Sequence, residues 1–459
     1  MGWLVFPVLP TYDSLSSLVW GRDILAGRLP RFDGFGAPTE HPLWVAVGTV
    51  LALLGDAAAR AMTLLTVASL VALVAATYRV GRTAFGPLAG ALAATLLLTR
   101  LDFGFYAAFA FLDVTFAALI VSAAAFEAER PQRGMAVWIL LVLAGLLRPE
   151  GWVYAGAYGA WLWMAGGRAR RALPGIVAWV AAAPLLWMLT DLIVTGRPLF
   201  SWTYTTGEAE ILGRRRTAAQ VPHAVLSALE ELLKWPVLVL AVFGLVLALR
   251  ERRRLALRMP LALVVIGVAT FALVVLGGVS GQVPRYASVA SVGLLLFAGY
   301  LLARLLRVPS GRGGRLAWAA TIAVVIVGVA WTAARLHPQS ITGLLRFRHG
   351  VETDLRATLR SPAVTEARHC GPVALATHKL VPAGRWALDA PPDAVVARAD
   401  PRRADPGVVL LEIGSRLLTD PGYGPFSTNS ADNGLESQVP PAGFERRGRS
   451  RYFAVYVRC

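Results

Sequence analysis

The sequence predicts an all-α polytopic membrane bundle followed by a small α+β domain, and three observations support this fold class. Hydrophobic residues make up 56% of the 459-residue chain and charged residues only 16%, whereas about a quarter of the residues in an average soluble domain are charged. Apolar runs that approach the roughly 20 residues needed to cross a bilayer recur between residues 42 and 333. After residue 336 the chain becomes rich in charge and proline. We therefore expect a membrane domain at 1–336, with about 11 spans, and a second domain at 337–459.

The arginine clusters predict the topology of the membrane domain. The formal net charge is +17, which in a soluble protein would indicate nucleic acid, but here the arginines gather between apolar runs. The clusters lie at 79–82, 130–133, 167–172, 250–258 and 307–315. An apolar pair between successive clusters places every cluster on the cytoplasmic side, as the positive-inside rule requires, and we predict no nucleic-acid partner. The spans then fall at 59–79, 85–100, 113–127, 135–148, 151–165, 173–195, 233–250, 259–278, 288–306 and 315–333.

The beginning of the chain does not fit a complete span. The run "MGWLVFPVLP" is half a span at best, so either the first helix is short or the start of the chain is missing, and we favour the second. The polar segment 10–41 must then be the first outer loop. Residues 42–55 are too short for a span, and counting them would invert the sidedness of all later spans. We therefore expect an interfacial helix at 42–55 on the outer side.

The C-terminal domain is predicted from short β-like runs such as "GVVLLEIG" and "RYFAVYVRC". The topology places this domain outside the plasma membrane. The chain's only cysteines, Cys370 and Cys459, both lie in it, and an extracytoplasmic location makes a disulfide between them plausible. Two unpaired buried cysteines are the alternative.

Ionisable residues collect at the outer ends of the predicted spans. Such groups are costly in a membrane unless they face a water-filled cavity or one another, so we expect a polar cavity roofed by the C-terminal domain. Asp113 is a single carboxylate within the apolar run "FAFLDVTF". Arg148 and Glu150 interrupt two short spans in "LLRPEGW" and either pair structurally or contact substrate. Solvated loop charges are the interpretation favoured for Arg100, Arg197 and Arg214 to Arg216.

The order of these motifs resembles that of GT-C fold glycosyltransferases, closest to the branch of protein O-mannosyltransferases and lipid A aminoarabinose transferases. An acidic residue, Asp13, is followed by "GRLP" and by "PTEHPL" leading into the interfacial helix, which is similar to that branch's first outer loop. "FLDVTFAAL" resembles its second acidic motif, "LLRPEGW" the inter-span motif, and "PRY" at 284–286 the late motif that contacts the donor phosphate. The resemblance covers roughly residues 1–306. The chain departs from the pattern at Ser14, where the family often has glutamate, and at His41, where many members have proline.

The resemblance implies transfer of a sugar from a polyprenyl-phosphate donor to an extracytoplasmic glycan, lipid or protein, with inversion. Asp13 would be the general base that accepts the acceptor proton. Arginine suits the leaving phosphate, so Arg285, Arg148 and Arg22 are candidates for it. Tyr286 would add a hydrogen bond, unless it is a tyrosine of the interfacial belt. The predicted substrate-binding residues are Glu40, His41, Asp113, Arg148, Glu150, Arg285 and Tyr286.

Metal and cofactor requirements are predicted from the ligand count. Glu40 and His41 leave a divalent metal conceivable, but one histidine and one glutamate are a poor ligand set. We therefore predict no cofactor and no metal. The sugar stays open, with mannose and arabinofuranose both compatible with the motifs.

Several residues in these segments also have a purely structural interpretation. Asp13 could simply cap a helix at 14–26. Asp23 is expected at the surface, and Asp33 in a turn. Residues 221–235 have apolar side chains at helical spacing, which predicts an amphipathic helix on the outer membrane surface or packed against the C-terminal domain.

Two other function classes compete with the transferase. A transporter or flippase of lipid-linked sugars would be expected to show internal repeats and broken helices at the bilayer midplane, and the sequence has no convincing repeat. A scaffold that binds the cell wall through its C-terminal domain would leave the outer-loop carboxylates unexplained. We therefore expect a multi-pass plasma-membrane glycosyltransferase of the cell envelope, with its active site and C-terminal domain outside and with membrane lipid around it.

Overall fold

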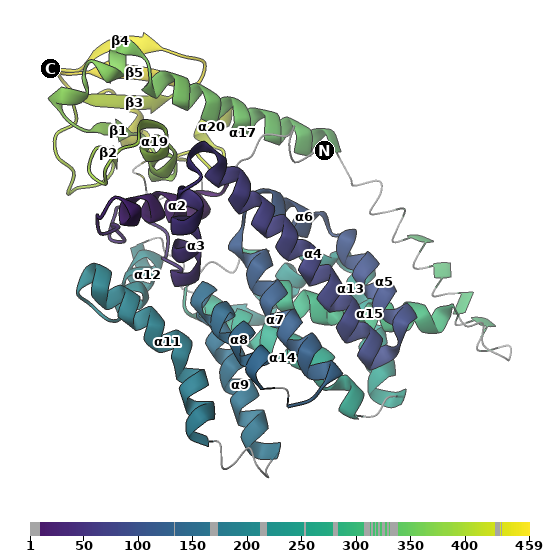
Figure 1. Ribbon diagram of the computed structural model, residues 1–459. Helices are drawn as coiled ribbons and strands as arrows, with labels where there is room; N and C mark the ends of the chain where they lie inside the picture. Colours follow the sequence, from purple (N-terminus) through teal and green to yellow (C-terminus); the bar gives the residue numbers. More distant parts are fainter. Residues whose placement is uncertain are drawn as a thin grey trace. The chain divides into compact units, whose positions relative to one another are not determined.

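The structure is a computed structural model and is mostly helical (Figure 1). By its contacts the chain divides into two compact units, which are described separately. The loop unit comprises Met1–Leu64, Leu189–Gly213 and Pro338–Cys459, and the helical unit comprises Leu65–Met188 and Arg214–His337. The described residues are 10–132, 134–165, 173–211, 218–251, 254–278, 283–306, scattered positions at 313–330, 338–426, 432 and 434–459.

The helical unit has a helix at each predicted span from 59–79 to 288–306. Of the two remaining predicted spans, residues 1–9 lie outside the described residues and 315–333 is described only at scattered positions. The helices are α4 (Ala58–Phe85), α5 (Pro87–Leu98), α6 (Leu101–Ala108), α7 (Leu112–Glu129), α8 (Met135–Leu147), α9 (Glu150–Ala165), α11 (Leu173–Thr195), α13 (Val221–Glu251), α14 (Arg254–Leu276) and α15 (Ser288–Leu305), of which α4 and α11 continue into the loop unit.

The length and composition of these helices are those of a multi-pass membrane protein. Within the described residues, five helical stretches are long and apolar enough to cross a membrane, and α5 and α6 would form a sixth as one span bent by 61°. The five are Gly55–Phe85, Leu173–Thr195, Ala218–Glu251, Ala256–Leu276 and Pro284–Leu305. The predicted polytopic bundle is therefore confirmed as a fold class.

Small residues let α15 pack closely against its neighbours. Of the apolar window in Pro284–Leu305, 83% is buried inside the protein, and α15 contacts α5, α13 and α14. A Cβ added at Gly299 would lie 2.6 Å from the Ala89 carbonyl oxygen, and one at Gly244 would lie 2.1 Å from the Phe297 carbonyl oxygen. Glycine at these contacts allows the close backbone approach that is typical of membrane helices.

Helix α13 is broken at Lys234, and Arg100 binds to the backbone at this break. Lys234 has φ 61° and ψ 146° within the helix, and Pro236 follows it, so the regular hydrogen-bond ladder is interrupted here. Arg100 donates from Nη1 to the Leu233 carbonyl oxygen over 2.5 Å and is only 7% exposed. The expectation that Arg100 is a solvated loop charge is therefore wrong, because a carbonyl group at a helix break needs a donor when it is buried. Arg197 is exposed as expected, and residues 214–216 lie outside the described residues.

The loop unit begins with two helices that pack closely together. Helices α2 (Tyr12–Leu25) and α3 (Pro42–Ala52) are in contact, and the helix expected at 42–55 is present as α3. A Cβ at Gly21 would lie 2.4 Å from the Thr49 nitrogen, and one at Gly48 the same distance from the Ser17 carbonyl oxygen. Helix α12 (Phe200–Ile211) also belongs to this unit. A cluster of buried side chains joins α2, the following loop, α3 and α12, namely Trp20, Phe32, Val45 and Phe200.

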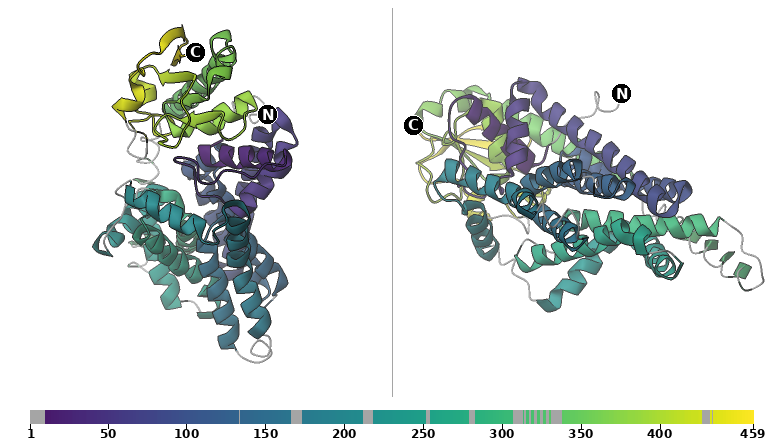
Figure 2. Two further views of the ribbon diagram at one scale, coloured as in Figure 1. Left: turned by 90° about the vertical axis from the view of Figure 1, so that its left-hand side faces the viewer. Right: turned by 60° about the horizontal axis from the view of Figure 1, so that its bottom comes forward.

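The C-terminal part of the loop unit is the predicted small α+β domain. Its five strands are β1 (Val373–Leu375), β2 (Val395–Ala397), β3 (Val408–Glu412), β4 (Glu445–Arg449) and β5 (Phe453–Val457), in the order β2-β1-β3-β5-β4. Strand β1 pairs in parallel with β2 and β3, whereas β5 pairs antiparallel with β3 and β4. These strands and helix α17 (Pro338–Leu359) can be followed from two further sides in Figure 2.

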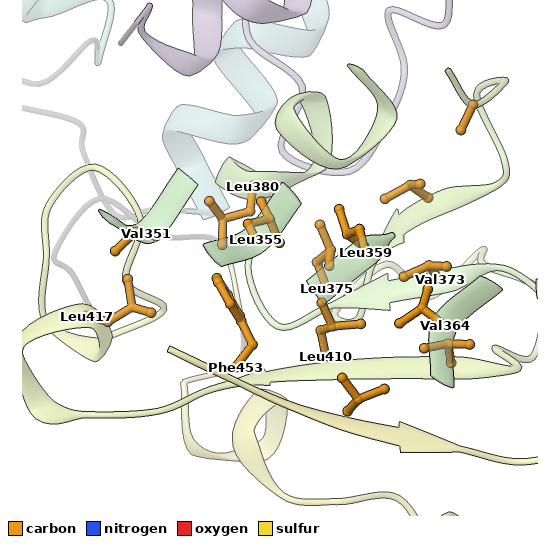
Figure 3. Packing of buried hydrophobic residues seen from close by; sticks show 14 of the residues in the cluster. Val351, Leu355, Leu359, Val364, Val373, Leu375, Leu380, Leu410, Leu417 and Phe453 are labelled. Carbon is orange, nitrogen blue, oxygen red and sulfur yellow. The ribbon is translucent and has the colours of Figure 1, made fainter. Parts of the chain in front are cut away.

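The core of this domain lies between the sheet and its helices. Val351, Leu355 and Leu359 of α17 meet strand residues such as Leu375, Leu410 and Phe453 (Figure 3). Helix α19 (Val381–Leu388) packs beside α17. Cys370, just before β1, forms a disulfide with Cys459 at the chain end, and their Cα atoms are 5.3 Å apart. The shorter helices are α18 (Pro362–Thr365), α20 (Ser415–Leu418) and α21 (Leu435–Gln438).

Candidate functional site

Five of the predicted site residues converge in the helical unit, and all five lie at helix ends. Asp113 is in the first turn of α7, Arg148 follows the last residue of α8 and Glu150 begins α9. Arg285 and Tyr286 belong to a short 3₁₀ turn, Pro284–Ala287, that precedes α15. Helix α8 ends at Leu147 because Arg148 precedes a proline, and a residue in that position is driven into the extended conformation.

Arg148 connects two buried carboxylates. Its Nη1 pairs with Oδ1 of Asp113, and its Nη2 lies 3.1 Å from Oε1 of Glu150. The Arg148 and Asp113 side chains are 7% and 5% exposed. A buried charge of this kind is tolerated when it is paired on several sides. These contacts favour a structural role for Arg148 and Glu150, one of the two interpretations left open by the sequence.

Arg285 shares Asp113 with Arg148. Its Nε lies 3.4 Å from Oδ2, the second carboxylate oxygen of Asp113, and its side chain is 24% exposed. Asp113 therefore sits between two guanidinium groups, of which that of Arg285 is the more accessible.

Aromatic rings hold both guanidinium groups in place. The Arg148 guanidinium carbon lies 3.8 Å from the centre of the Tyr286 ring, and that of Arg285 lies 4.9 Å from the centre of the Phe111 ring. Such cation–π contacts favour a cation over the ring face. Phe111 is not among the predicted site residues, although it stands two residues before Asp113 in the same motif.

Asp13 lies in the first turn of α2 in the loop unit. The N-cap is Thr11, whose hydroxyl oxygen accepts a hydrogen bond from the Ser14 amide over 3.3 Å. Asp13 is therefore not the cap, and the helix begins two residues earlier than expected. The first turn of a helix favours a negative charge, so this position suits a carboxylate.

Glu40 and His41 lie at the start of α3, with His41 at its N-cap position. Glu40 is only 1% exposed, and one of its carboxylate oxygens accepts a hydrogen bond from the Ser201 hydroxyl. The same hydroxyl lies 2.6 Å from Oδ1 of Asp191, and the Ser201 amide donates to Oδ2 of Asp191 over 3.0 Å. Asp191 is not among the predicted site residues, although a single carboxylate in the apolar run "LLWMLTDLIV" is the same signal that marked Asp113.

Charged residues of the first loop contact the C-terminal domain, and for Asp23 and Arg22 these contacts differ from what their local sequence predicts. Asp23, expected at the surface, has a fully buried side chain and accepts two hydrogen bonds from Arg385, of 2.7 and 3.0 Å. Arg22, a candidate for the phosphate, donates to the Arg385 carbonyl oxygen over 2.9 Å and pairs with Asp389 at 3.0 Å. Both expectations considered local sequence only, and the partners are more than 350 residues away along the chain.

The predicted site residues thus fall into two groups, each described within its own unit. Asp13, Glu40 and His41 belong to the loop unit, whereas Asp113, Arg148, Glu150, Arg285 and Tyr286 belong to the helical unit. Joining the two groups in one cavity stays a prediction.

No protein-family model matches the sequence, and no curated protein matches it either. Two solved structures are similar along almost the whole chain. One is ArnT from Cupriavidus metallidurans bound to undecaprenyl phosphate, with a TM-score of 0.57 and 15% sequence identity, covering 99% of this chain and 95% of that chain. The other is ArnT from Cupriavidus metallidurans in the apo state, with a TM-score of 0.54 and 16% identity, covering 98% and 94%. ArnT is a lipid A aminoarabinose transferase of the GT-C fold, so the predicted GT-C-like fold is confirmed.

Proposed function

We propose that this protein is a membrane glycosyltransferase that transfers a sugar from a polyprenyl-phosphate donor to an extracytoplasmic acceptor. The observation that carries the proposal is the buried cluster around Asp113, in which the partly exposed Arg285 is held by a carboxylate and an aromatic ring. The cluster occurs in a GT-C-like fold, and a neighbour with that fold was solved with undecaprenyl phosphate.

In this proposal Arg285 binds the donor phosphate. Arginine presents two parallel N–H groups to a phosphate, which gives both charge and geometry. Arg148 is already engaged by Asp113 and Glu150, so its part is to hold Asp113 in place. Asp113 would then be a positioning residue that orients Arg285. The phosphate is a good leaving group, and it needs stabilisation of its charge more than a proton.

Asp13 is proposed as the general base. The hydroxyl oxygen of the acceptor attacks the anomeric carbon, its proton passes to the Asp13 carboxylate, and the bond from that carbon to the phosphate oxygen breaks. The electron pair leaves with polyprenyl phosphate. A single displacement of this kind inverts the anomeric configuration.

The loop unit, which includes the C-terminal domain, is proposed to lie outside the plasma membrane. The disulfide between Cys370 and Cys459 supports this side, because disulfides persist in oxidising compartments. Arg79 and Arg82 lie near the C-terminal end of α4, which supports a cytoplasmic location for that end of the helix.

The test is transfer in detergent with a panel of polyprenyl-phosphate sugars and a glycan and glycolipid extract as the source of acceptor. Release of polyprenyl phosphate is the readout. We expect release by the unaltered protein, a loss of about 100-fold or more in Arg285→Ala, and partial activity in Arg285→Lys. Arg197→Ala, at an exposed arginine, is the matched control. Equal release by Arg285→Ala and the control would contradict the phosphate assignment, and no release from any donor would contradict the proposed reaction.

A further inference from the structure

The loop unit contains a cavity that is lined by residues other than the predicted site residues. Its volume is about 80 Å³. It is lined by one face of α2, by the loop that follows, and by the segments around α19 and β2. The lining residues include Tyr12, Arg31, Phe35, His378, Arg385 and Asp400. A cavity needs about 10–15 Å³ of accessible volume to hold one water. This cavity therefore has room for roughly five to eight waters, or for one small polar ring.

The imidazole ring of His378 is buried, and one of its two nitrogens already has a hydrogen-bond partner. Its Nδ1 lies 3.0 Å from Oδ2 of Asp432, and the two side chains are 6% and 0% exposed. The Asp432 carboxylate also accepts from the Thr377 hydroxyl over 2.8 Å and from the His378 amide over 3.0 Å. An ionised carboxylate only accepts hydrogen bonds, so Nδ1 carries a hydrogen, and in the neutral ring Nε2 then presents a lone pair. Among the described residues, Nε2 has no hydrogen-bond partner.

The first loop closes directly on this histidine. The centres of the Tyr12 and Phe35 rings lie 5.9 and 6.2 Å from that of His378, both edge to face. Gly36 has φ +61°, and a Cβ there would lie 2.5 Å from Cδ2 of His378. Only glycine allows the backbone this close to the ring. The cavity therefore combines a hydrogen-bond acceptor with two partly exposed aromatic rings.

The charges around the cavity are already neutralised. Arg385 is bonded to Asp23 at 2.7 Å, and Arg31 pairs with Asp393 and, at 3.3 Å, with Asp33. Asp400 pairs with Arg402, whose Nε lies 3.5 Å from Oδ1 of Asp400. A phosphate or carboxylate ligand would require a cation in excess, and the described lining residues supply none, so the ligand that fits is neutral.

We propose that this cavity binds one neutral sugar ring of the acceptor. A ring hydroxyl donates to Nε2 of His378, and the apolar face of the ring lies against Tyr12 and Phe35, whose ring faces carry partial negative charge. Tyr12 is adjacent in sequence to Asp13, the carboxylate proposed as the base. The inference rests on the proposed function and deepens it, because it makes the acceptor a carbohydrate and not a protein side chain.

The test measures sugar binding by the full-length protein in detergent. Saturation-transfer NMR is recorded with methyl α-mannopyranoside, methyl β-glucopyranoside and methyl β-galactopyranoside. We expect a signal for at least one of them and its loss in His378→Asn, whose amide replaces Nδ1 toward Asp432 but does not reach the position of Nε2. His378→Gln should retain part of the signal, since its amide does reach that position. His349→Asn, at an exposed histidine of α17, is the matched control.

A second variant and a second measurement keep the inference open to contradiction. Phe35→Ala leaves the bonds of Asp432 untouched and should weaken the same signal. In the transfer assay, His378→Asn should raise the acceptor KM about five- to tenfold, as expected for one lost hydrogen bond, with the donor KM unchanged. No signal from any glycoside, or equal signals in both variants and the control, would overturn the inference.

Failure of this inference is distinguishable from failure of the proposed function. If Asp13→Asn abolishes transfer while His378→Asn keeps the unaltered acceptor KM, the transferase stands and the cavity assignment is wrong. If glycoside binding depends on His378 but no donor releases polyprenyl phosphate, the cavity stands as a sugar site and the proposed reaction is wrong.

Discussion

Arg148 and Asp113, 35 positions apart in the sequence, form a buried ion pair between the end of one helix and the start of another. Neither residue is placed by its own helix alone. Pro149 ends α8 in front of Arg148, and Asp113 falls in the first turn of α7, so the pair forms only because the two helix ends meet. A carboxylate with two guanidinium partners is the centre of the candidate site.

Asp113→Asn should be more harmful than Glu150→Gln. The first change takes the negative charge from both Arg148 and Arg285, whereas the second leaves Arg148 paired with Asp113. Removing one partner of a buried pair typically costs about 3–5 kcal/mol. Thermal unfolding and the donor KM should both change more in Asp113→Asn, and equal effects in the two variants would contradict this account.

Asp13→Asn should abolish transfer without destabilising the protein. The cap of α2 is Thr11 and not Asp13, so the substitution leaves the capping hydrogen bond intact. Removing a general base typically reduces the rate by about 10²- to 10⁴-fold. The variant should keep the melting temperature of the unaltered protein within a few degrees, and turnover within a factor of ten would exclude Asp13 as the base.

Stability of the C-terminal domain should fall as the pH rises toward neutrality. Burial raises the pKa of Glu352 from 4.5 to about 7, and its carboxyl oxygen lies 2.7 Å from the Tyr423 hydroxyl. The folded state therefore holds this proton more tightly than the unfolded state does. Its contribution is fully present below about pH 4.5 and is lost as the pH passes 7, by roughly 3 kcal/mol.

Glu352→Gln should remove this pH dependence, because the amide is neutral at every pH. The melting temperature of the purified protein, measured between pH 5 and 8, is the readout. Glu445→Gln, at an exposed glutamate of β4, should keep the dependence. If the melting temperature changes with pH equally in both variants, groups other than Glu352 cause the pH dependence.

The disulfide should stabilise the C-terminal domain substantially. Cys370 and Cys459 are separated by 89 positions, and closing a loop of that length restricts the unfolded chain by an amount worth about 2–5 kcal/mol. Cys370→Ser should lower the melting temperature, and reductant should do the same to the unaltered protein but not to the variant. If reductant also lowers the melting temperature of Cys370→Ser, the lower stability has a cause other than this disulfide.

Local sequence was sufficient to predict a helix or strand wherever a single residue pattern extends over the whole segment. The spans, the helix after Pro42 and the short strands follow from apolar runs, prolines and β-branched residues, and the structure has elements at each of these places within its described residues. The break at Lys234 separates the predicted amphipathic segment from the predicted span, because Pro236 cannot continue the hydrogen-bond ladder.

The sequence was insufficient for residues whose surroundings come from distant parts of the chain. Asp23, Arg22 and Arg100 each look like ordinary surface or loop residues in their local sequence, and each has a partner more than 100 residues away. Whether a charge is solvated or buried is decided by the segments that cover it, and local composition carries little information about those segments.

By itself, the sequence determined that this is a multi-pass membrane protein with a separate α+β domain, and it identified the acidic and arginine-containing motifs that resemble those of GT-C enzymes. Hydrophobicity and charge act over a few residues or one span, so they can be read locally. Only the tertiary structure decided that Asp113, Arg148 and Arg285 share one ion-pair cluster, and that His378 of the C-terminal domain faces a cavity closed by the first loop. Those relationships depend on which helix ends and loops meet, and that is a property of the packed chain.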